Sequence, residues 1–176
     1  MCKFILIQGK ENAGKTTTCW EIYKDLVTKL SKNDNGHPVV HEFIIPDREI
    51  TLQTTSVMSV RELTVMEEDS QYYQPKNDYN MDFIAVLPIN SKRIGIISAG
   101  DNSNMMQCAL KTCLKRQVDM VVMAARSWDS DISHFCGEKK IIPLFDGEKP
   151  IKKELTENNR TTIKEEIVRQ IEDFVK

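Results

Sequence analysis

The sequence predicts an α/β domain of three layers, with a mainly parallel sheet covered by helices on both faces. The first observation behind this prediction is that short apolar runs alternate with amphipathic helical patterns along the chain. The second is a hairpin pattern at residues 82–98, which adds one antiparallel strand. The third is the length of 176 residues, which suits one domain with its own core. We therefore expect residues 1–176 to form a single domain.

The first half of the chain is predicted from its apolar spacing. Residues 3–8 (KFILIQ) predict a buried strand, and residues 16–30 predict an amphipathic helix. Residues 39–45 (VVHEFII) predict a second strand, and residues 59–68 a short helix. The surrounding segment, residues 47–81, is otherwise irregular. Long irregular segments often act in function, so we interpret it as a lid or switch segment.

The second half has clearer patterns. Two apolar runs, residues 82–89 and 93–98, predict the hairpin, and a helix follows at residues 102–115. A buried strand is expected at residues 119–125 and a last strand at residues 141–145. The sequence TIKE, which begins at Thr162, resembles a capping box and predicts the start of the final helix.

Composition excludes several classes of protein. The chain has 24 basic and 26 acidic residues and a net charge of -2, which gives no strong signal for nucleic-acid binding. No apolar stretch is long enough to predict a membrane span. The five cysteines have no zinc-ligand spacing, which favours reduced thiols in a cytoplasmic protein.

The most informative segment is residues 9–16 (GKENAGKT), which matches the pattern GxxxxGK[ST] at every fixed position. Backbone N–H groups in such a loop surround a polyphosphate, and the following helix N-terminus adds partial positive charge. Lys15 can reach the β- and γ-phosphates, and the Thr16 hydroxyl can ligate Mg²⁺. The candidate phosphate-binding residues are Gly9, Lys10, Glu11, Asn12, Ala13, Gly14, Lys15, Thr16 and Thr17.

This segment, with a strand before it and a helix after it, resembles the Walker A motif of the P-loop NTPase superfamily. The resemblance implies a P-loop NTPase-like domain that binds ATP or GTP with Mg²⁺. Residues 14–18 (GKTTT) also resemble the GKTT versions of signal-recognition and partitioning NTPases. The chain lacks the extra glycine of the former and the second lysine of the latter, so we assign no finer family.

A P-loop NTPase also needs an acid near its metal, usually at the end of a neighbouring strand. Residues 94–101 (IGIISAGD) place Asp101 just past a predicted strand end, so Asp101 is the candidate metal-side acid. The region resembles the interswitch region of small GTPases, with Ser98 where their aspartate stands. The alternative is therefore that Ser98 and a water do this work, and Asp101 can also cap the next helix. Asp47 and Asp82 are weaker candidates.

Arg126 follows the predicted strand at residues 119–125. An arginine there could stabilise charge on a transferring phosphoryl group, lie against the base, or simply be solvated. The sequence after this strand is AARS rather than the NKxD that reads guanine in G proteins. ATP is therefore expected more than GTP.

Together these features predict a Mg²⁺-dependent protein that binds a nucleoside triphosphate. The expected activity is ATP hydrolysis, or phosphoryl transfer to a small-molecule or nucleotide acceptor, with Lys15, Asp101 and Arg126 as catalytic residues. One alternative is a regulatory NTPase switch that signals to a protein partner through residues 47–81. The other is an adaptor that binds nucleotide without turnover.

Overall fold

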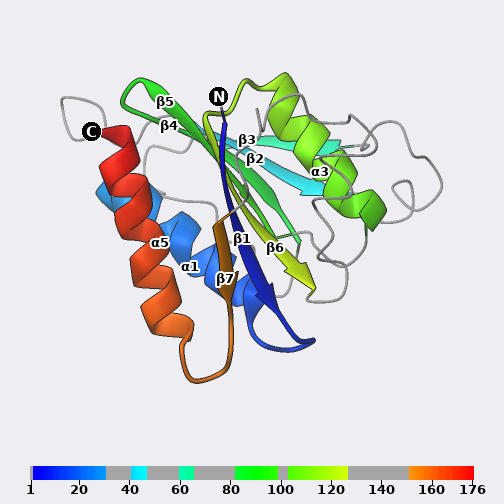
Figure 1. The fold of residues 1–176 in the computed structure, drawn as a ribbon. Coiled ribbons are helices and arrows are strands. Elements are labelled where there is room, and N and C mark those ends of the chain that lie inside the picture. Colours follow the sequence, from blue (N-terminus) through cyan, green and yellow to red (C-terminus); the bar gives the residue numbers. More distant parts are fainter. Residues whose placement is uncertain (1, 31–40, 47–59, 66–81, 99–102, 127–150) are drawn as a thin grey trace.

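The structure is a computed structural model that describes residues 2–30, 41–46, 60–65, 82–98, 103–126 and 151–176 (Figure 1). The strands are β1 (Lys3–Gly9), β2 (His41–Pro46), β3 (Val60–Val65), β4 (Ile84–Ile89), β5 (Lys92–Ile97), β6 (Met120–Arg126) and β7 (Ile151–Glu154). The helices are α1 (Lys15–Lys29), α3 (Ser103–Lys115) and α5 (Arg160–Val175).

The described strands form one mixed sheet in the order β3-β2-β4-β5-β6-β1-β7. The pairs β5–β6, β6–β1 and β1–β7 are parallel, whereas β3–β2, β2–β4 and β4–β5 are antiparallel. Both β3 and β4 thus run against the other strands, so the prediction of one antiparallel strand is wrong. Apolar spacing marks a strand but carries no information on which neighbour it pairs with.

Helices cover both faces of the sheet, which confirms the α/β fold of three layers. Helix α3 lies on one face, and α1 and α5 lie together on the other (Figure 1). An apolar core lies on each face of the sheet, and alternate residues of β1 point into one or the other. Phe4 and Leu6 pack in the core under α3, and Ile5 and Ile7 pack in the core under α1 and α5. Strand β1 is buried on both sides, as a central parallel strand must be.

Four aromatic side chains join α1 to the antiparallel half of the sheet. The Trp20 and Phe83 ring centroids are 4.4 Å apart, and Phe43 stacks on Phe83 at 5.1 Å. Tyr23 packs against the same rings, and all four side chains are buried. The cluster fixes α1, and therefore the turn that precedes α1, relative to the sheet.

Three predicted elements need comment. Residues 59–68 are not a helix, because β3 occupies Val60–Val65 and pairs with β2. Helix α5 begins at Arg160 with Asn159 as N-cap, so the predicted start at Thr162 is wrong. The predicted strand at residues 141–145 lies outside the described residues, as does most of the segment 47–81. Strand β7 was not predicted.

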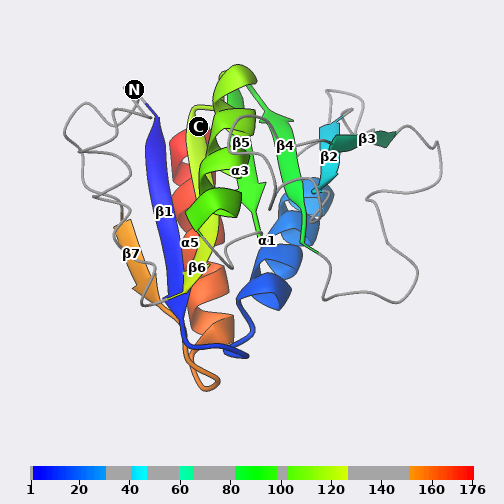
Figure 2. The same cartoon turned by 90° about the vertical axis from the view of Figure 1, so that its right-hand side faces the viewer.

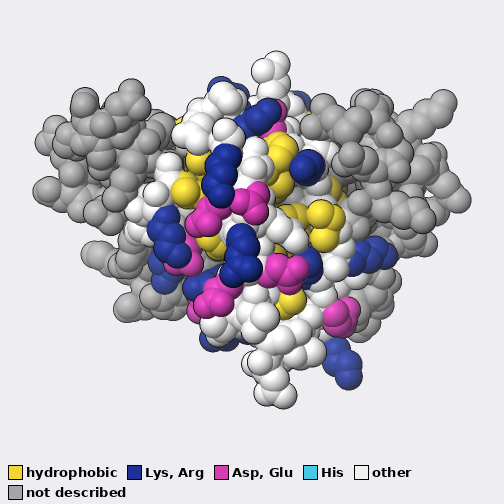
Figure 3. All heavy atoms as spheres, turned by 60° about the vertical axis from the view of Figure 1, so that its left-hand side comes forward, with side chains coloured by type: hydrophobic (Ala, Val, Ile, Leu, Met, Phe, Trp, Pro, Cys, Tyr) yellow, Lys and Arg dark blue, Asp and Glu magenta, His cyan; other side chains and the backbone are white. Residues whose placement is uncertain are grey.

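The surface over α1 and α5 carries both signs of charge (Figure 3). Asp25 of α1 pairs with Lys164 of α5 at 3.1 Å and with Lys29 at 3.5 Å. Such exposed pairs contribute little to stability, about 0–1 kcal/mol each. Within the described part of the chain, no helix has the length and apolar character needed to cross a bilayer.

We predict that Phe83→Ala lowers the free energy of unfolding by about 3–5 kcal/mol, because it leaves a cavity between Trp20 and Phe43. Urea denaturation measures the change. Ile151→Ala is the control: its side chain is 44% exposed, so its effect should stay within about 0.5 kcal/mol. Equal effects of the two variants would contradict the role of the aromatic cluster.

Candidate functional site: a phosphate loop between β1 and α1

The candidate loop lies where the chain passes from β1 into α1. Strands β1, β6 and β7 point toward this end of the sheet (Figure 2). The carboxyl ends of parallel strands are where α/β sheets place their ligands. The segment predicted from the sequence to hold phosphate therefore lies at the end of the sheet where ligands are expected.

The loop backbone has the conformation of an anion-binding concavity. Asn12 has φ 61° and Gly14 has φ 84°, so two residues in the left-handed region flank Ala13. Backbone of this kind is found in loops whose N–H groups surround anions. In this loop the Ala13 N–H donates to the Lys10 carbonyl oxygen at 3.3 Å, so the donors that remain for a ligand are those at the start of α1. Gly14 is the N-cap of α1, and the first N–H groups of a helix have no partner within it. These donors and the helix dipole act on the same small volume.

Lys15 places a positive charge on the loop itself. Its Nζ donates to the carbonyl oxygens of Gly9 at 2.9 Å and Lys10 at 2.7 Å. The side chain thus folds back across the loop rather than extending along α1. An ammonium held at the start of a helix is of the right charge to neutralise a polyphosphate.

The three threonines after Lys15 differ in their surroundings. Thr18 is fully buried, and its Oγ1 donates to the Gly14 carbonyl oxygen at 2.9 Å. Thr18 therefore stabilises the first turn of α1. Thr16 and Thr17 are half-buried. This arrangement is compatible with the predicted metal role of Thr16.

Gly9 is required by packing as well as by the motif. A Cβ on Gly9 would lie 2.9 Å from the carbonyl oxygen of Leu155, the residue that follows β7. The Leu155 N–H donates to the Gln8 carbonyl oxygen at 2.6 Å, which holds the two segments together. The start of the loop is therefore fixed by a part of the chain that is remote in sequence.

The predicted metal-side segment lies one strand further away than expected. Strand β5, which precedes Asp101, neighbours β6 and β4 rather than β1. At ~4.8 Å per strand, β5 lies about 10 Å from β1. Helix α1 spans this distance, because the Cys19 thiol donates to the Ile97 carbonyl oxygen at 3.7 Å. Asp101 itself, like Asp47, lies outside the described residues, so its metal role stays a prediction.

Ser98 has a structural function in the hairpin. Its Oγ accepts from the Phe83 N–H at 2.8 Å and donates to the Phe83 carbonyl oxygen at 3.4 Å. The side chain is buried at 3% exposure. These bonds lock the end of β5 to the start of β4, so the hydroxyl is already engaged there.

Asp82 lies next to this lock and is buried at 6% exposure. Because β4 is antiparallel to β5, the start of β4 lies at the same end of the sheet as the end of β5. The charges of Asp82 and Lys15 both act on the Cys19 thiol. The pKa of Cys19 is raised to about 12, mainly by burial and in addition by the Asp82 charge, while the Lys15 charge opposes the rise. Asp82 directly precedes Phe83, the residue that bonds to Ser98.

Arg126 is the last residue of β6, and its Cα pairs in register with that of Gly9. Its backbone therefore adjoins the first residue of the loop. The described residues contain no group of three or more His, Cys, Asp or Glu side chains arranged to hold a metal. A metal bound through Thr16 and phosphate oxygens would need no such group.

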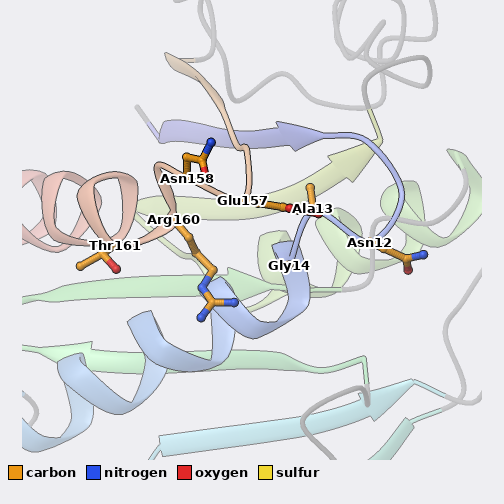
Figure 4. Close-up of a pocket in the computed structure, with 7 residues that line it drawn as sticks. All are labelled: Asn12, Ala13, Gly14, Glu157, Asn158, Arg160 and Thr161. Carbon is orange, nitrogen blue, oxygen red and sulfur yellow. The ribbon is translucent and has the colours of Figure 1, made fainter.

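A small cavity opens beside the loop, on the side away from Asp82. Its volume is about 220 Å³, and it is formed by residues 12–14 and by the turn between β7 and α5 (Figure 4). Arg160 reaches from this turn toward Gly14. The sequence analysis missed this contribution. No local signal could have found it, because the turn is brought to the loop by contacts between residues remote in sequence, namely the pairing of β7 with β1 and the packing of α5 on α1.

Comparisons of the chain with protein-family models, with curated proteins and with solved structures find no match.

We predict that Cys19 resists alkylation at about pH 8 until the protein unfolds. Its raised pKa leaves the thiol protonated, and the thiol contributes stability below pH about 9 that is lost as the pH rises toward about 12. Peptide mass spectrometry after iodoacetamide treatment should show labelling at least about 100-fold slower in the native protein than in urea. Similar native and denatured rates would contradict the buried environment.

Proposed function

We propose that the chain binds a nucleoside triphosphate with Mg²⁺, ATP more than GTP, through Gly9–Thr17, and hydrolyses it or transfers its terminal phosphoryl group. The observation that carries this proposal is the position of the motif. Residues with every fixed identity of a phosphate loop form a strand-to-helix turn with left-handed Asn12 and Gly14. Lys15 is folded across that turn.

In this proposal the residues of the site act mainly through electrostatic stabilisation. In phosphoryl transfer, negative charge is spread over the oxygens of the transferring group, and fixed positive groups stabilise it. Lys15 and the N–H groups of the loop supply such charge at the β- and γ-phosphates. Arg126, next to Gly9 in the sheet register, would add a second cation. Mg²⁺ bound at Thr16 would neutralise charge between the β- and γ-phosphates.

The nucleophile distinguishes the reactions that this site could support. Water as the attacking group gives hydrolysis, whereas a hydroxyl or phosphate of an acceptor gives a kinase. A base must accept the nucleophile's proton. The candidates are Asp82, next to the start of β4, and Asp101, which follows β5 in the sequence. The order of the sheet, with β6 between β1 and β5, departs from the neighbouring-strand arrangement on which the prediction of Asp101 as the metal-side acid was based.

Phosphate release with ATP and with GTP, alone and with a panel of nucleoside monophosphates, separates the alternatives. Turnover that depends on a monophosphate supports a kinase, and slow turnover without an acceptor supports a hydrolase or switch. Binding without turnover under all conditions would leave the adaptor and overturn the enzymatic part of the proposal.

We predict that Lys15→Ala removes tight triphosphate binding, with affinity reduced about 10- to 100-fold, because a charge-assisted contact to phosphate is lost. Isothermal titration calorimetry with ATP and Mg²⁺ measures the change. Lys29→Ala is the matched control: it removes the same charge from the exposed end of α1, and its affinity should equal that of the wild type. Unchanged affinity in Lys15→Ala would exclude the loop as the phosphate site.

We predict that Asp101→Ala raises the Mg²⁺ concentration needed for half-maximal turnover about 10- to 100-fold, with a smaller effect on nucleotide affinity. A magnesium titration of activity makes the measurement. Asp173→Ala, at an exposed acid of α5, should leave the titration unchanged. If Asp82→Asn shifts the titration and Asp101→Ala does not, the metal-side acid is Asp82 and the assignment of Asp101 is wrong.

A further inference from the structure

We propose that the cavity between the phosphate loop and the β7–α5 turn binds the nucleobase of the nucleotide. In this arrangement Arg160 packs on the face of the base, and Asn158 and Glu157 meet its edge. The inference rests on the proposed function and adds to it a subsite that the sequence analysis did not contain. The cavity, the rigidity of its far wall, the placement of Arg160 and the chemistry of the lining each support it.

The cavity shares its near wall with the phosphate loop. Residues 12–14 line it on one side, and Glu157, Asn158, Arg160 and Thr161 line it on the other (Figure 4). Its volume of about 220 Å³ is smaller than the ~300–1,000 Å³ of a pocket for a whole ligand. The cavity thus suits one part of a molecule whose charged remainder lies on the adjoining loop.

The far wall is a rigid turn. Asn159 Oδ1 accepts from the Thr156 N–H at 2.8 Å, and Asn159 Nδ2 donates to the Glu154 carbonyl oxygen at 2.9 Å. The Leu155 N–H is bonded to Gln8 of β1 at 2.6 Å. Since the turn is tied both to itself and to the strand that carries the loop, the two walls are held at a fixed separation. A pre-formed site loses less conformational entropy when a ligand binds.

Arg160 lies directly against the loop. A Cβ on Gly14 would be 3.3 Å from the Arg160 Cδ and 3.4 Å from its Nη1, so the Arg160 side chain lies within contact distance of the loop backbone. The ion pair between Arg160 and Glu21 is long, at 3.8 Å, and both side chains are partly exposed, at 44% and 34%. Such a pair contributes little energy, so a ligand can compete for the guanidinium group.

The chemistry of the lining favours a base over a further anion. A guanidinium plane stacks on flat aromatic rings, as arginine does with unstacked bases. The Asn158 amide offers both a donor and an acceptor, which can pair with the edge of adenine. Glu157, which extends toward Ala13 in Figure 4, and Glu21 add negative charge around Arg160. Two carboxylates near one guanidinium make the cavity a poor site for another phosphate.

The test compares ATP with inorganic tripolyphosphate, which keeps the phosphates and lacks the base and the ribose. Wild type and Arg160→Ala are titrated with ATP and with inorganic tripolyphosphate, each with Mg²⁺, by calorimetry. We expect Arg160→Ala to lower ATP affinity about 5- to 150-fold, the range for one stacked base, and to leave tripolyphosphate affinity unchanged. Arg160→Lys, which keeps the charge but not the plane, should lose ATP affinity to a similar extent.

Two further variants serve as controls. Arg169→Ala removes the same charge from an exposed position of α5 and should leave both affinities unchanged. Asn158→Ala should reduce the ratio of affinities among ATP, GTP, CTP and UTP, because this amide is assigned to the edge of the base. Thermal unfolding of each variant confirms that the fold is retained.

Other results would overturn the inference. Equal losses for ATP and tripolyphosphate in Arg160→Ala would assign Arg160 to the phosphates, and an unchanged ATP affinity would place the base elsewhere. If the wild type binds tripolyphosphate as tightly as ATP, the base has no subsite, although the phosphate loop stands. If the wild type binds neither ligand, the proposed function itself fails.

Discussion

The left-handed backbone of Gly14 is the constraint on which the rest of the candidate site depends. With φ 84°, Gly14 ends the loop and begins α1, and with Asn12 it reverses the direction of the backbone around Ala13, whose N–H donates to the Lys10 carbonyl oxygen at 3.3 Å. A side chain at this position would be strained and would also meet Arg160. One residue without a Cβ therefore sets the direction of α1, the shape of the concavity and the closeness of the β7–α5 turn.

The mixed sheet explains how the candidate groups are distributed around this loop. Strand β6 separates β1 from the hairpin, so the acidic side of the site is not supplied by the strand next to the loop. Helix α1 links the two instead, through Cys19 near Ile97 and through the aromatic cluster around Trp20. Buried Asp82 and buried Ser98 mark the point where the hairpin meets this helix.

The opposite side of the loop is formed by β7 and by the turn between β7 and α5. Strand β7 pairs with β1. The hydrogen bond from the Leu155 N–H to the Gln8 carbonyl oxygen holds the segment between β7 and α5 beside Gly9. The turn then presents Arg160 to Gly14. The candidate loop thus has two different environments. The β4–β5 hairpin, linked to it by α1, carries a buried acid, whereas the β7–α5 turn is more exposed and carries mixed charges.

The sequence by itself determined the strand, loop and helix of residues 3–29, because apolar spacing and the fixed residues of the motif are local properties. It also identified the hairpin, α3 and β6 within a residue or two. Only the tertiary structure decided that β3 is a strand, since its partner β2 stabilises it. The sequence of β7, IKKE, is short and mostly exposed, so no periodicity marks it. Its pairing with β1 brings Arg160 to the loop, and pairing between residues so far apart in sequence follows from the packing of the whole chain.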